Sequence, residues 1–386
     1  SIPGDPIKLT VDIRLQHILR REIEQTMHDF TATGGTGMIM DVKSGAVRAL
    51  VSLPDFDPHQ VSTAKDTQKF NRATLATYEL GSTFKIFTTA AAFEQLNLRM
   101  SQSYDTRQPI KVGRFTISDF HPENRTLTIP EVFMHSSNIG TAMMAQQIGT
   151  DGLKSFYDQI GFFNSLSFDL PETGRPIIPK PWRDVTTLTA SYGHGIAITP
   201  LHLASATATI IGDGTVVHPY LVENEAKELD AMATRVISEK TVQKMRALMR
   251  LVVSHGTAQK ANIPGFFIGG KTGTAEKNVN GKYVHNALVS SFVGAFPMND
   301  PQYVVLVTID DPKPNPKSYG YATAGWTAAP AAARVIVGMS AVLAIAPEPN
   351  MRDPADALTP YLAEFCNPKS ETPKMVTRVA SCLSVP

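Results

Sequence analysis

Ser82 and Lys85 have the residue types and the spacing that nucleophilic catalysis needs. They lie in "ELGSTFKIFTTAAAF", residues 79–93, where almost no charge follows the lysine. A lysine is almost never fully buried unless it is paired, and an unpaired buried ammonium tends to lose its proton. A desolvated lysine with a lowered pKa can take the proton of a serine hydroxyl, which is otherwise a weak nucleophile. The pair therefore predicts a serine nucleophile with a lysine base.

The position of Ser82 adds a second chemical feature. If a helix begins near Ser82, both side chains lie on the same helix face and within reach of each other. The backbone N–H of a residue in the first turn has no partner within the helix, so it can stabilise an oxyanion. Taken alone, Ser-x-x-Lys is a common pattern, and an ordinary helix N-cap is the alternative interpretation.

Two further stretches can contribute to the same site. "HSSNIG" contains Ser136 and Asn138, and its simpler interpretation is a polar helix start capped by Ser136 or Ser137. "GGKTGTA" contains Lys271, Thr272, Gly273 and Thr274, which we expect on a strand. Glycines weaken a strand unless another backbone must come close, and an extended substrate that pairs with a strand edge requires that closeness.

The stretch "GFFIGGKT", residues 265–272, matches the phosphate-loop pattern G-x-x-x-x-G-K-[ST]. That pattern binds phosphate only as a loop between a strand and a helix. Here the residues between the glycines suit a strand, and a hairpin turn follows instead of a helix. We therefore reject the nucleotide-binding interpretation.

The elements that must position these residues can be read from hydrophobic periodicity. A helix is expected after the N-cap Asp12, and two strands are expected around the turn at residues 43–45. Further predictions are a helix over 238–253, a hairpin around Asn280-Gly281, a strand over 302–310 and a buried helix over 335–346. The pattern predicts an α+β fold: a largely antiparallel sheet of about five strands, flanked by helices, with a helix-rich subdomain. We expect one domain over residues 1–347 and a proline-rich C-terminal tail over 348–386.

Bulk composition excludes several classes of protein. The chain has 386 residues, a net charge of +1 and 42% hydrophobic residues, which fits a globular protein with no electrostatic footprint for nucleic acid. No apolar stretch is long enough to span a bilayer, and the histidines show no metal-binding pattern, so neither a metal nor a cofactor is expected. The two cysteines, Cys366 and Cys382, are either free thiols or a disulfide, and the sequence leaves both open.

In this order, Ser-x-x-Lys, Ser-x-Asn and Lys-Thr-Gly are the three signatures of penicillin-interacting serine enzymes. From about residue 5 to 345 the chain resembles the transpeptidase domain of class B penicillin-binding proteins. The stretches that carry the resemblance are "TVDIRLQ", "NRATLATYELGSTFK", "YGHGIAITPLHLASA", "GGKTGTAEK" and "GWTAAPAA". Asn138 and the sequence around Ser82 and Tyr192 most resemble those of the division-type (septal, penicillin-binding protein 3 type) enzymes of alphaproteobacteria.

The resemblance implies a reaction and a role for each motif residue. Ser82 would attack the carbonyl between the two terminal D-alanines of a peptidoglycan stem peptide, and an amine of a second stem would then attack the acyl-enzyme. Lys85 would be the base for Ser82. Ser136, between Lys85 and Lys271, would relay the proton to the leaving nitrogen. Asn138 would hold a substrate amide and orient Lys85.

The third motif would bind the substrate. Thr272 and Thr274 would hydrogen-bond the substrate carboxylate, on the strand that also contains Gly273. The backbone N–H groups of Ser82 and Thr274 would form the oxyanion hole. β-Lactams would acylate the same serine. Tyr192 and His194 can line the cleft, but we favour a packing role for them.

The resemblance also implies a cellular setting. Class B proteins carry a single N-terminal membrane anchor and a pedestal domain ahead of this region, so we expect the domain at the periplasmic face of the bacterial inner membrane. The expected partners are peptidoglycan stem peptides, β-lactams and membrane proteins of the division complex, including a glycosyltransferase. Two alternatives remain open: a D-alanyl-D-alanine carboxypeptidase, and a β-lactam-binding sensor or scaffold.

Overall fold

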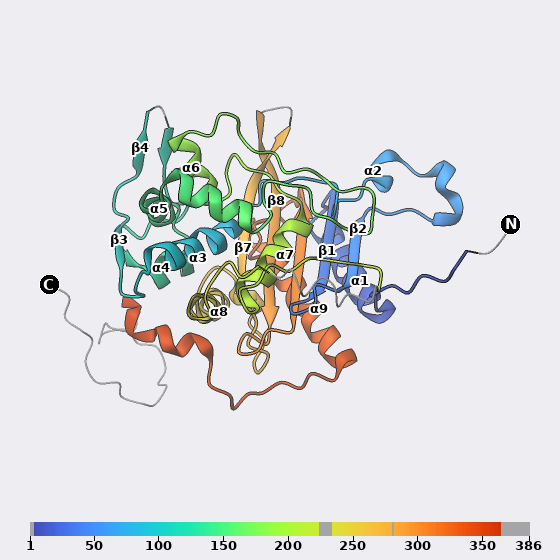
Figure 1. Ribbon diagram of the computed structural model, residues 1–386. Helices are drawn as coiled ribbons and strands as arrows, with labels where there is room; N and C mark the ends of the chain where they lie inside the picture. The colour runs from blue at the N-terminus through green and yellow to red at the C-terminus, as the bar shows by residue number, and fades with distance from the viewer. Residues whose placement is uncertain (1–3, 114, 224–233, 280–281, 364–386) are drawn as a thin grey trace.

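The computed structural model describes residues 4–363 except 114, 224–233 and 280–281, and a five-stranded sheet lies at its centre (Figure 1). The strand order is β2-β1-β9-β8-β7, and every neighbouring pair is antiparallel. The strands are β1 (Gly34–Asp41), β2 (Val47–Leu53), β7 (Gly269–Val279), β8 (Lys282–Phe296) and β9 (Tyr303–Asp310). The third motif therefore lies on β7, an edge strand of the sheet.

The remaining elements are helices and short strands. The α-helices are α1 (Ile13–Asp29), α2 (Asp66–Lys69), α3 (Lys85–Leu96), α4 (Ile129–Met134), α5 (Asn138–Gln159), α6 (Asp184–Ala190), α7 (Pro200–Ile211), α8 (Glu239–Ser254) and α9 (Ala328–Leu343). The short strands are β3 (Ser103–Asp105), β4 (Ile110–Val112), β5 (Phe115–Ile117) and β6 (Thr126–Thr128). The 3-10 helices are η1 (Pro58–Thr63), η2 (Gly81–Phe84), η5 (Gln259–Ala261), η6 (Pro316–Ser318) and η7 (Pro354–Tyr361).

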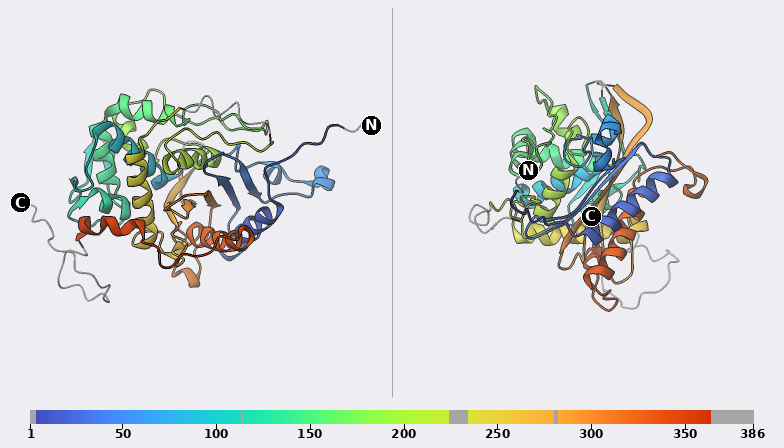
Figure 2. Two further views of the ribbon diagram at one scale, coloured as in Figure 1. Left: turned by 60° about the horizontal axis from the view of Figure 1, so that its bottom comes forward. Right: turned by 90° about the vertical axis from the view of Figure 1, so that its right-hand side faces the viewer.

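Helices cover both faces of the sheet (Figure 2). Helices α1 and α9 pack together on one face, whereas α7 packs on the other and α8 contacts β7. Helix α1 begins after Asp12, whose carboxylate accepts from the Arg14 N–H at 2.9 Å, as expected from the sequence. Its close approach to β1 requires a glycine, because a Cβ on Gly35 would lie 2.5 Å from Cγ2 of Ile23. With helices on both faces of the sheet, the core of the domain is a three-layer α/β/α arrangement.

Beside β7 lies the helix-rich subdomain, in which α5 packs against α3, α4 and α6 (Figure 1). Two small antiparallel sheets, β3–β6 and β4–β5, complete it. The first nine residues of α3 are all buried, so this helix joins the subdomain to the central core. The expected α+β fold, with an antiparallel sheet of five strands and a helical subdomain, is confirmed.

Several local expectations are confirmed and one is wrong. The turn at residues 43–45 joins β1 to β2, and the helix near Ser238 is α8, capped by the Ser238 side chain. Strands β7 and β8 pair up to Val279 and Lys282, while Asn280 and Gly281 lie outside the described residues. The segment 265–272 leads into this strand pair rather than into a helix. Ser82, however, does not begin an α-helix, because residues 81–84 form a 3-10 turn and α3 starts at Lys85.

Residues 348–363 continue along the surface of the domain. Helix η7 buries Ala355 and Leu358, and Asp353 pairs with the buried Arg250 of α8 at 2.7 Å. Cys366 and Cys382 lie outside the described residues, so their pairing stays a prediction. In the described part of the chain, no helix combines the length and the apolar character needed to cross a bilayer.

Candidate active site

Ser82 lies in a turn that two other segments hold by backbone contact. Gly81 has a φ of +53°, and a Cβ there would lie 3.0 Å from the Thr274 carbonyl oxygen. On the opposite side, a Cβ on Gly193 would lie 2.2 Å from the Gly81 carbonyl oxygen. On β7, a Cβ on Gly273 would lie 2.2 Å from the Leu80 carbonyl oxygen. The half-buried Ser82 is therefore fixed next to Gly273 and Thr274 of the third motif.

Lys85 is fully buried, and its ammonium group points at the second motif. It contacts the Ser136 carbonyl oxygen, Ser136 Oγ at 3.1 Å and Asn138 Oδ1 at 2.7 Å. Burial lowers the pKa of Lys85 well below its ordinary value, and the positive charge of Lys271 lowers this pKa further. A neutral amine has two N–H donors and one lone pair, which matches two carbonyl oxygens and one hydroxyl. The site therefore accommodates Lys85 in its neutral form.

The partners of Lys85 differ from the simplest sequence expectation. We expected its proton to be shared with Ser82, three residues earlier. Among the hydrogen bonds of the described residues, those of the Lys85 amine all go to Ser136 and Asn138. The second motif thus holds the amine at the end of the nucleophile turn.

The second motif forms the junction between α4 and α5. Ser136 has a φ of +60°, which turns the chain sharply between the two helices. Ser137, not Ser136, caps α5, because its hydroxyl accepts from the Gly140 N–H at 3.0 Å. Ser136 is therefore free of the capping role, and its hydroxyl points to the lysines. Asn138 is the first residue of α5 and reaches Lys85 with its amide oxygen.

The third motif supplies a second buried lysine from β7. Lys271 is fully buried and donates to Ser136 Oγ at 2.9 Å and to the Thr272 carbonyl oxygen at 3.3 Å. Burial lowers the pKa of Lys271 to about 7. Thr272 Oγ1 is bonded to Thr257 Oγ1 at 2.6 Å, and Thr274 Oγ1 accepts from the Ala324 N–H at 3.0 Å. The structure thus joins all three motifs around the hydroxyl of Ser136.

Three residues that the motifs do not include form a cluster beside the nucleophile turn. Glu79 accepts from the Tyr283 hydroxyl at 2.9 Å, and its carboxylate lies 3.3 Å from His194 Nδ1. The rings of His194 and Tyr283 stack at 4.9 Å. Tyr192 packs against the small apolar cluster that includes Ile117, as favoured from the sequence, and its ring also stacks on that of His194 at 6.5 Å. Both His194 and Tyr283 are partly exposed. Because Tyr283 lies on β8 and Glu79 lies just before the nucleophile turn, their hydrogen bond connects β8 to the segment that leads into Ser82.

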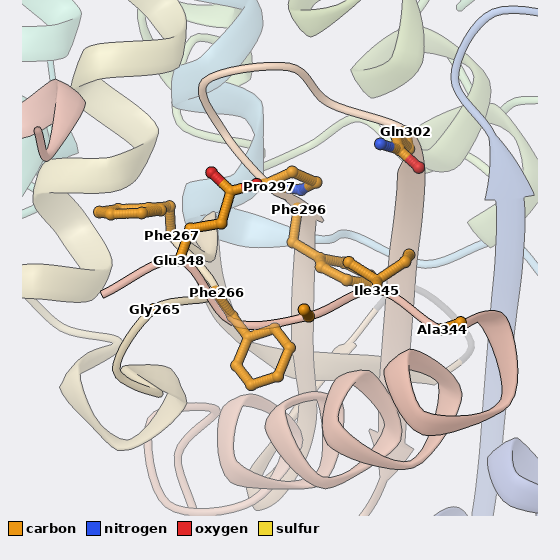
Figure 3. Close-up of a pocket in the computed structure, with 10 residues that line it drawn as sticks. Gly265, Phe266, Phe267, Phe296, Pro297, Gln302, Ala344, Ile345 and Glu348 are labelled. Atoms are coloured by element: carbon orange, nitrogen blue, oxygen red, sulfur yellow. The ribbon is translucent and has the colours of Figure 1, made fainter. Parts of the chain in front are cut away.

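The pocket drawn in Figure 3 is a separate feature. It has a volume of about 360 Å³ and lies between the end of β8, the chain after α9 and the aromatic pair Phe266 and Phe267. Its lining includes no residue of the three motifs. The candidate active site is therefore defined by side-chain and backbone contacts and not by this cavity.

A serine turn, a Ser-x-Asn helix junction and a Lys-Thr-Gly edge strand that meet in one place define the class of penicillin-interacting serine proteins. The sequence profile of the penicillin binding protein transpeptidase domain matches residues 35–336. The chain therefore belongs to the family of penicillin-binding protein transpeptidase domains, as the three motifs predicted.

Individual relatives agree with this assignment. The chain is 37% identical over 351 residues to the probable peptidoglycan D,D-transpeptidase FtsI of Caulobacter vibrioides. The alignment covers 89% of this chain and 59% of that protein. The chain is 31% identical over 365 residues to the probable peptidoglycan D,D-transpeptidase PenA of Neisseria flavescens, with 93% and 89% covered. Both alignments include most of the present chain. The relative from Caulobacter agrees with the resemblance to a division-type enzyme of an alphaproteobacterium.

Among solved structures, the chain is similar to the TP domain of penicillin-binding protein 3 from Burkholderia pseudomallei. The TM-score is 0.78 at 28% identity, and the match covers 91% of this chain and 100% of that chain. The structural comparison thus gives the same family as the sequence profile.

Proposed function

We propose that this chain is the catalytic domain of a peptidoglycan D,D-transpeptidase that cross-links stem peptides through a serine acyl-enzyme during septal wall synthesis. The observation that carries the proposal is the Ser136 hydroxyl, which lies between two fully buried lysines at 3.1 and 2.9 Å. Buried lysines with lowered pKa values are able to exchange protons near neutral pH. A scaffold that only binds does not need such a pair.

In the first half of the reaction, Ser82 Oγ bonds to the carbonyl carbon between the two terminal D-alanines. Neutral Lys85 takes the hydroxyl proton, and the backbone N–H groups of Ser82 and Thr274 stabilise the oxyanion. A single donor of that kind contributes about 3–4 kcal/mol in the transition state. The proton then passes through Ser136 to the leaving nitrogen, and D-alanine departs. Asn138 keeps the amine of Lys85 turned toward this path.

The edge strand β7 supports the binding of the donor peptide. Because β7 is the last strand of the sheet, an extended peptide can pair with its free edge. Its carboxylate would meet the hydroxyls of Thr272 and Thr274 near Lys271, which is protonated at the acid side of its pKa of about 7. Gly273 permits the close approach to the nucleophile turn. In the second half of the reaction an amine of a neighbouring stem peptide attacks the acyl-enzyme. The new amide bond is the cross-link, and Ser82 is released.

The wider setting is also part of the proposal. The relatives named FtsI and PenA are described as probable peptidoglycan D,D-transpeptidases. We infer a domain at the periplasmic face of the inner membrane, held by an N-terminal anchor, that works with membrane proteins of the division complex, including a glycosyltransferase. β-Lactams, which copy the D-alanyl-D-alanine end, would acylate Ser82. We take residues 1–347 as the catalytic domain and 348–386 as a C-terminal tail.

The test is intact-mass measurement after incubation with benzylpenicillin, followed by peptide mapping. We expect one adduct, on Ser82, and none in the Ser82→Ala variant, whose stability should change by no more than about 1 kcal/mol because Ser82 caps no helix. Ser101→Ala, an exposed serine in a turn, is the matched control and should label like the wild type. Labelling of Ser82→Ala at the wild-type level would refute the assignment. A synthetic stem peptide with an added amine acceptor then distinguishes cross-linking from simple hydrolysis.

A further inference from the structure

Asp119, which belongs to none of the three motifs, binds the start of α5 at three points. One carboxylate oxygen accepts from the Asn138 N–H at 2.6 Å and from the Ile139 N–H at 3.0 Å. The other accepts from the Ser137 hydroxyl at 2.7 Å. Asp119 is half-buried and follows β5, so a separate segment of the subdomain holds the helix that presents the second motif.

The neighbouring residue fixes the side chain of Asn138. The amide nitrogen of Asn138 donates to the Ser118 carbonyl oxygen at 2.9 Å, while its amide oxygen faces Lys85 at 2.7 Å. A flipped amide would point its N–H₂ group at the lysine amine and lose both hydrogen bonds. Residues 118 and 119 thus determine, through backbone and side chain together, which end of Asn138 faces Lys85.

The charge of Asp119 also acts on Lys85. Burial and the positive charge of Lys271 lower the pKa of Lys85, and the negative charge of Asp119 acts in the opposite direction. Directly after α4, His135 lies next to Ser136, and its Nδ1 is 3.2 Å from the carboxylate of Glu123. The nearest acidic residue further along α3 is Glu94, nine positions away, or about 13 Å of helix. Asp119 is therefore the carboxylate with the main electrostatic effect on this lysine.

We propose that Asp119 is a positioning residue for acyl transfer: it fixes Asn138 so that the amide oxygen faces Lys85, and its charge offsets that of Lys271 at the lysine base. The proposal rests on the proposed function of this site. A purely structural interpretation exists, in which Asp119 only adds to the helix cap that Ser137 already provides. The two interpretations differ in what they predict for the pH dependence of acylation.

The test compares three variants by the second-order rate constant of acylation with a fluorescent penicillin, measured from about pH 5 to about pH 10. Asp119→Asn keeps an oxygen that can accept from the two backbone N–H groups but removes the charge. Without that charge Lys85 loses its proton more readily, so the acid limb of the profile should move to lower pH by about 0.5 to 1. The rate at the plateau should fall, because the Asn138 contact is less well fixed.

Two matched variants separate charge from position. Ser137→Ala removes the hydroxyl bonded to Asp119 and the capping bond, but it keeps the charge. It should unfold at lower denaturant concentration and leave the acid limb in place. Asp119→Glu keeps the charge at a changed distance, so the plateau rate should fall at least tenfold while the acid limb stays near that of the wild type.

Each result decides the matter. A profile of Asp119→Asn that superimposes on that of the wild type would overturn the electrostatic role. A plateau rate of Asp119→Glu within twofold of the wild type would overturn the positioning role, and this variant decides alone if Asp119→Asn does not fold. A wild-type protein that forms no adduct on Ser82 would instead refute the proposed function, so the two failures are distinguishable.

Discussion

Lys85 and Lys271, one from α3 and one from β7, contact the same hydroxyl oxygen, that of Ser136, at 3.1 and 2.9 Å. Both side chains are fully buried. Two ammonium groups so close together in a buried site repel each other, and neither has water to solvate it. The arrangement is therefore favourable only when at most one of the two lysines is protonated. The hydroxyl of Ser136, which contacts both amines, is then a natural path for a proton between them.

Replacement of Lys85 by arginine separates charge from proton transfer. Arginine keeps its proton under all conditions in a protein, so Lys85→Arg retains the positive charge but cannot act as a base. We expect the acylation rate with benzylpenicillin to fall by orders of magnitude. Lys277→Arg is the matched control and should acylate normally, because Lys277 on β7 pairs with Asp310 and belongs to none of the three motifs. An arginine variant within tenfold of the wild type would mean that position 85 supplies only charge.

The pH dependence of acylation follows from the two lowered pKa values. Lys85 acts as a base only without its proton, so the rate should fall as the pH drops below the pKa of Lys85, which lies well below 10.5. Lys271 attracts the drug carboxylate only with its proton, so the rate should also fall as the pH rises above the pKa of Lys271, about 7. The expected profile is a bell. Rapid-quench mass spectrometry over the pH range measures it, and a rate that rises only near pH 10 would show an ordinary, unperturbed lysine base.

The contact between Gly193 and Gly81 predicts that a displacement of the nucleophile turn, without any change of a catalytic side chain, slows acylation. Gly193→Ala would place its Cβ 2.2 Å from the Gly81 carbonyl oxygen, so the nucleophile turn must shift. Gly195 has almost the same φ, +79° against +81°, but the nearest atom to a Cβ there is 3.8 Å away. Gly195→Ala is thus the control for backbone strain, which costs about 1–2 kcal/mol in both variants.

We expect Gly193→Ala to lose far more acylation rate than Gly195→Ala and to unfold at a lower denaturant concentration. Penicillin acylation kinetics and urea titrations of both variants measure this difference. Equal effects of the two substitutions would show that the turn tolerates movement and that Ser82 does not depend on the contact between Gly193 and Gly81.

The sequence predicted those features that have a local chemical signature. The alternation of apolar residues and the glycine turns identified the antiparallel strands, and the three motifs identified the residues that now surround Ser136. Each motif lies at a turn or on an edge strand, where its spacing has a direct structural meaning. The phosphate-loop pattern at residues 265–272 shows that a matching motif alone is not sufficient. Its residues lead into the strand pair β7–β8 and not into a helix, so the pattern has no phosphate-binding context here.

What the sequence did not reveal depends on contacts between distant segments. Asp119 reaches Asn138 over 19 positions, and Tyr283 reaches Glu79 over 204, so no local pattern marks either contact. For Lys85, i,i+3 spacing alone suggested Ser82 as the partner, and only the family resemblance implied the contacts with Ser136 and Asn138 that the structure shows. The positive φ of Ser136 turns the second motif toward the amine. Backbone torsions of that kind are set by the packing of α4 against α5 and are not visible in residue types.

The persistence of the acyl-enzyme is the last prediction, and it depends on a residue that the site lacks. Class A β-lactamases hydrolyse their acyl-enzyme with a glutamate downstream of the second motif. The comparable acidic residue here is Glu172, in "LPETGRP", without the Glu-x-x-Leu-Asn pattern of those enzymes. Its carboxylate accepts from the Asn71 side chain at 3.2 Å, and among the described residues it has no hydrogen bond to the motifs. Glu172 is therefore not placed to activate water on the acylated serine, and we expect the bound drug to block the approach of water to Lys85.

The penicilloyl adduct on Ser82 should accordingly persist for many minutes after excess drug is removed, and hydrolysis of nitrocefin should be negligible. The decay of the mass adduct and the absorbance change of nitrocefin give the two rates. Glu172→Gln is the decisive comparison, because a glutamate that activates water would make its replacement slow the decay strongly. In this protein the decay should be the same in both forms, since Glu172 contacts Asn71. Nitrocefin turnover near the typical enzymatic rate of about 10 per second would identify a β-lactamase and refute the transpeptidase proposal.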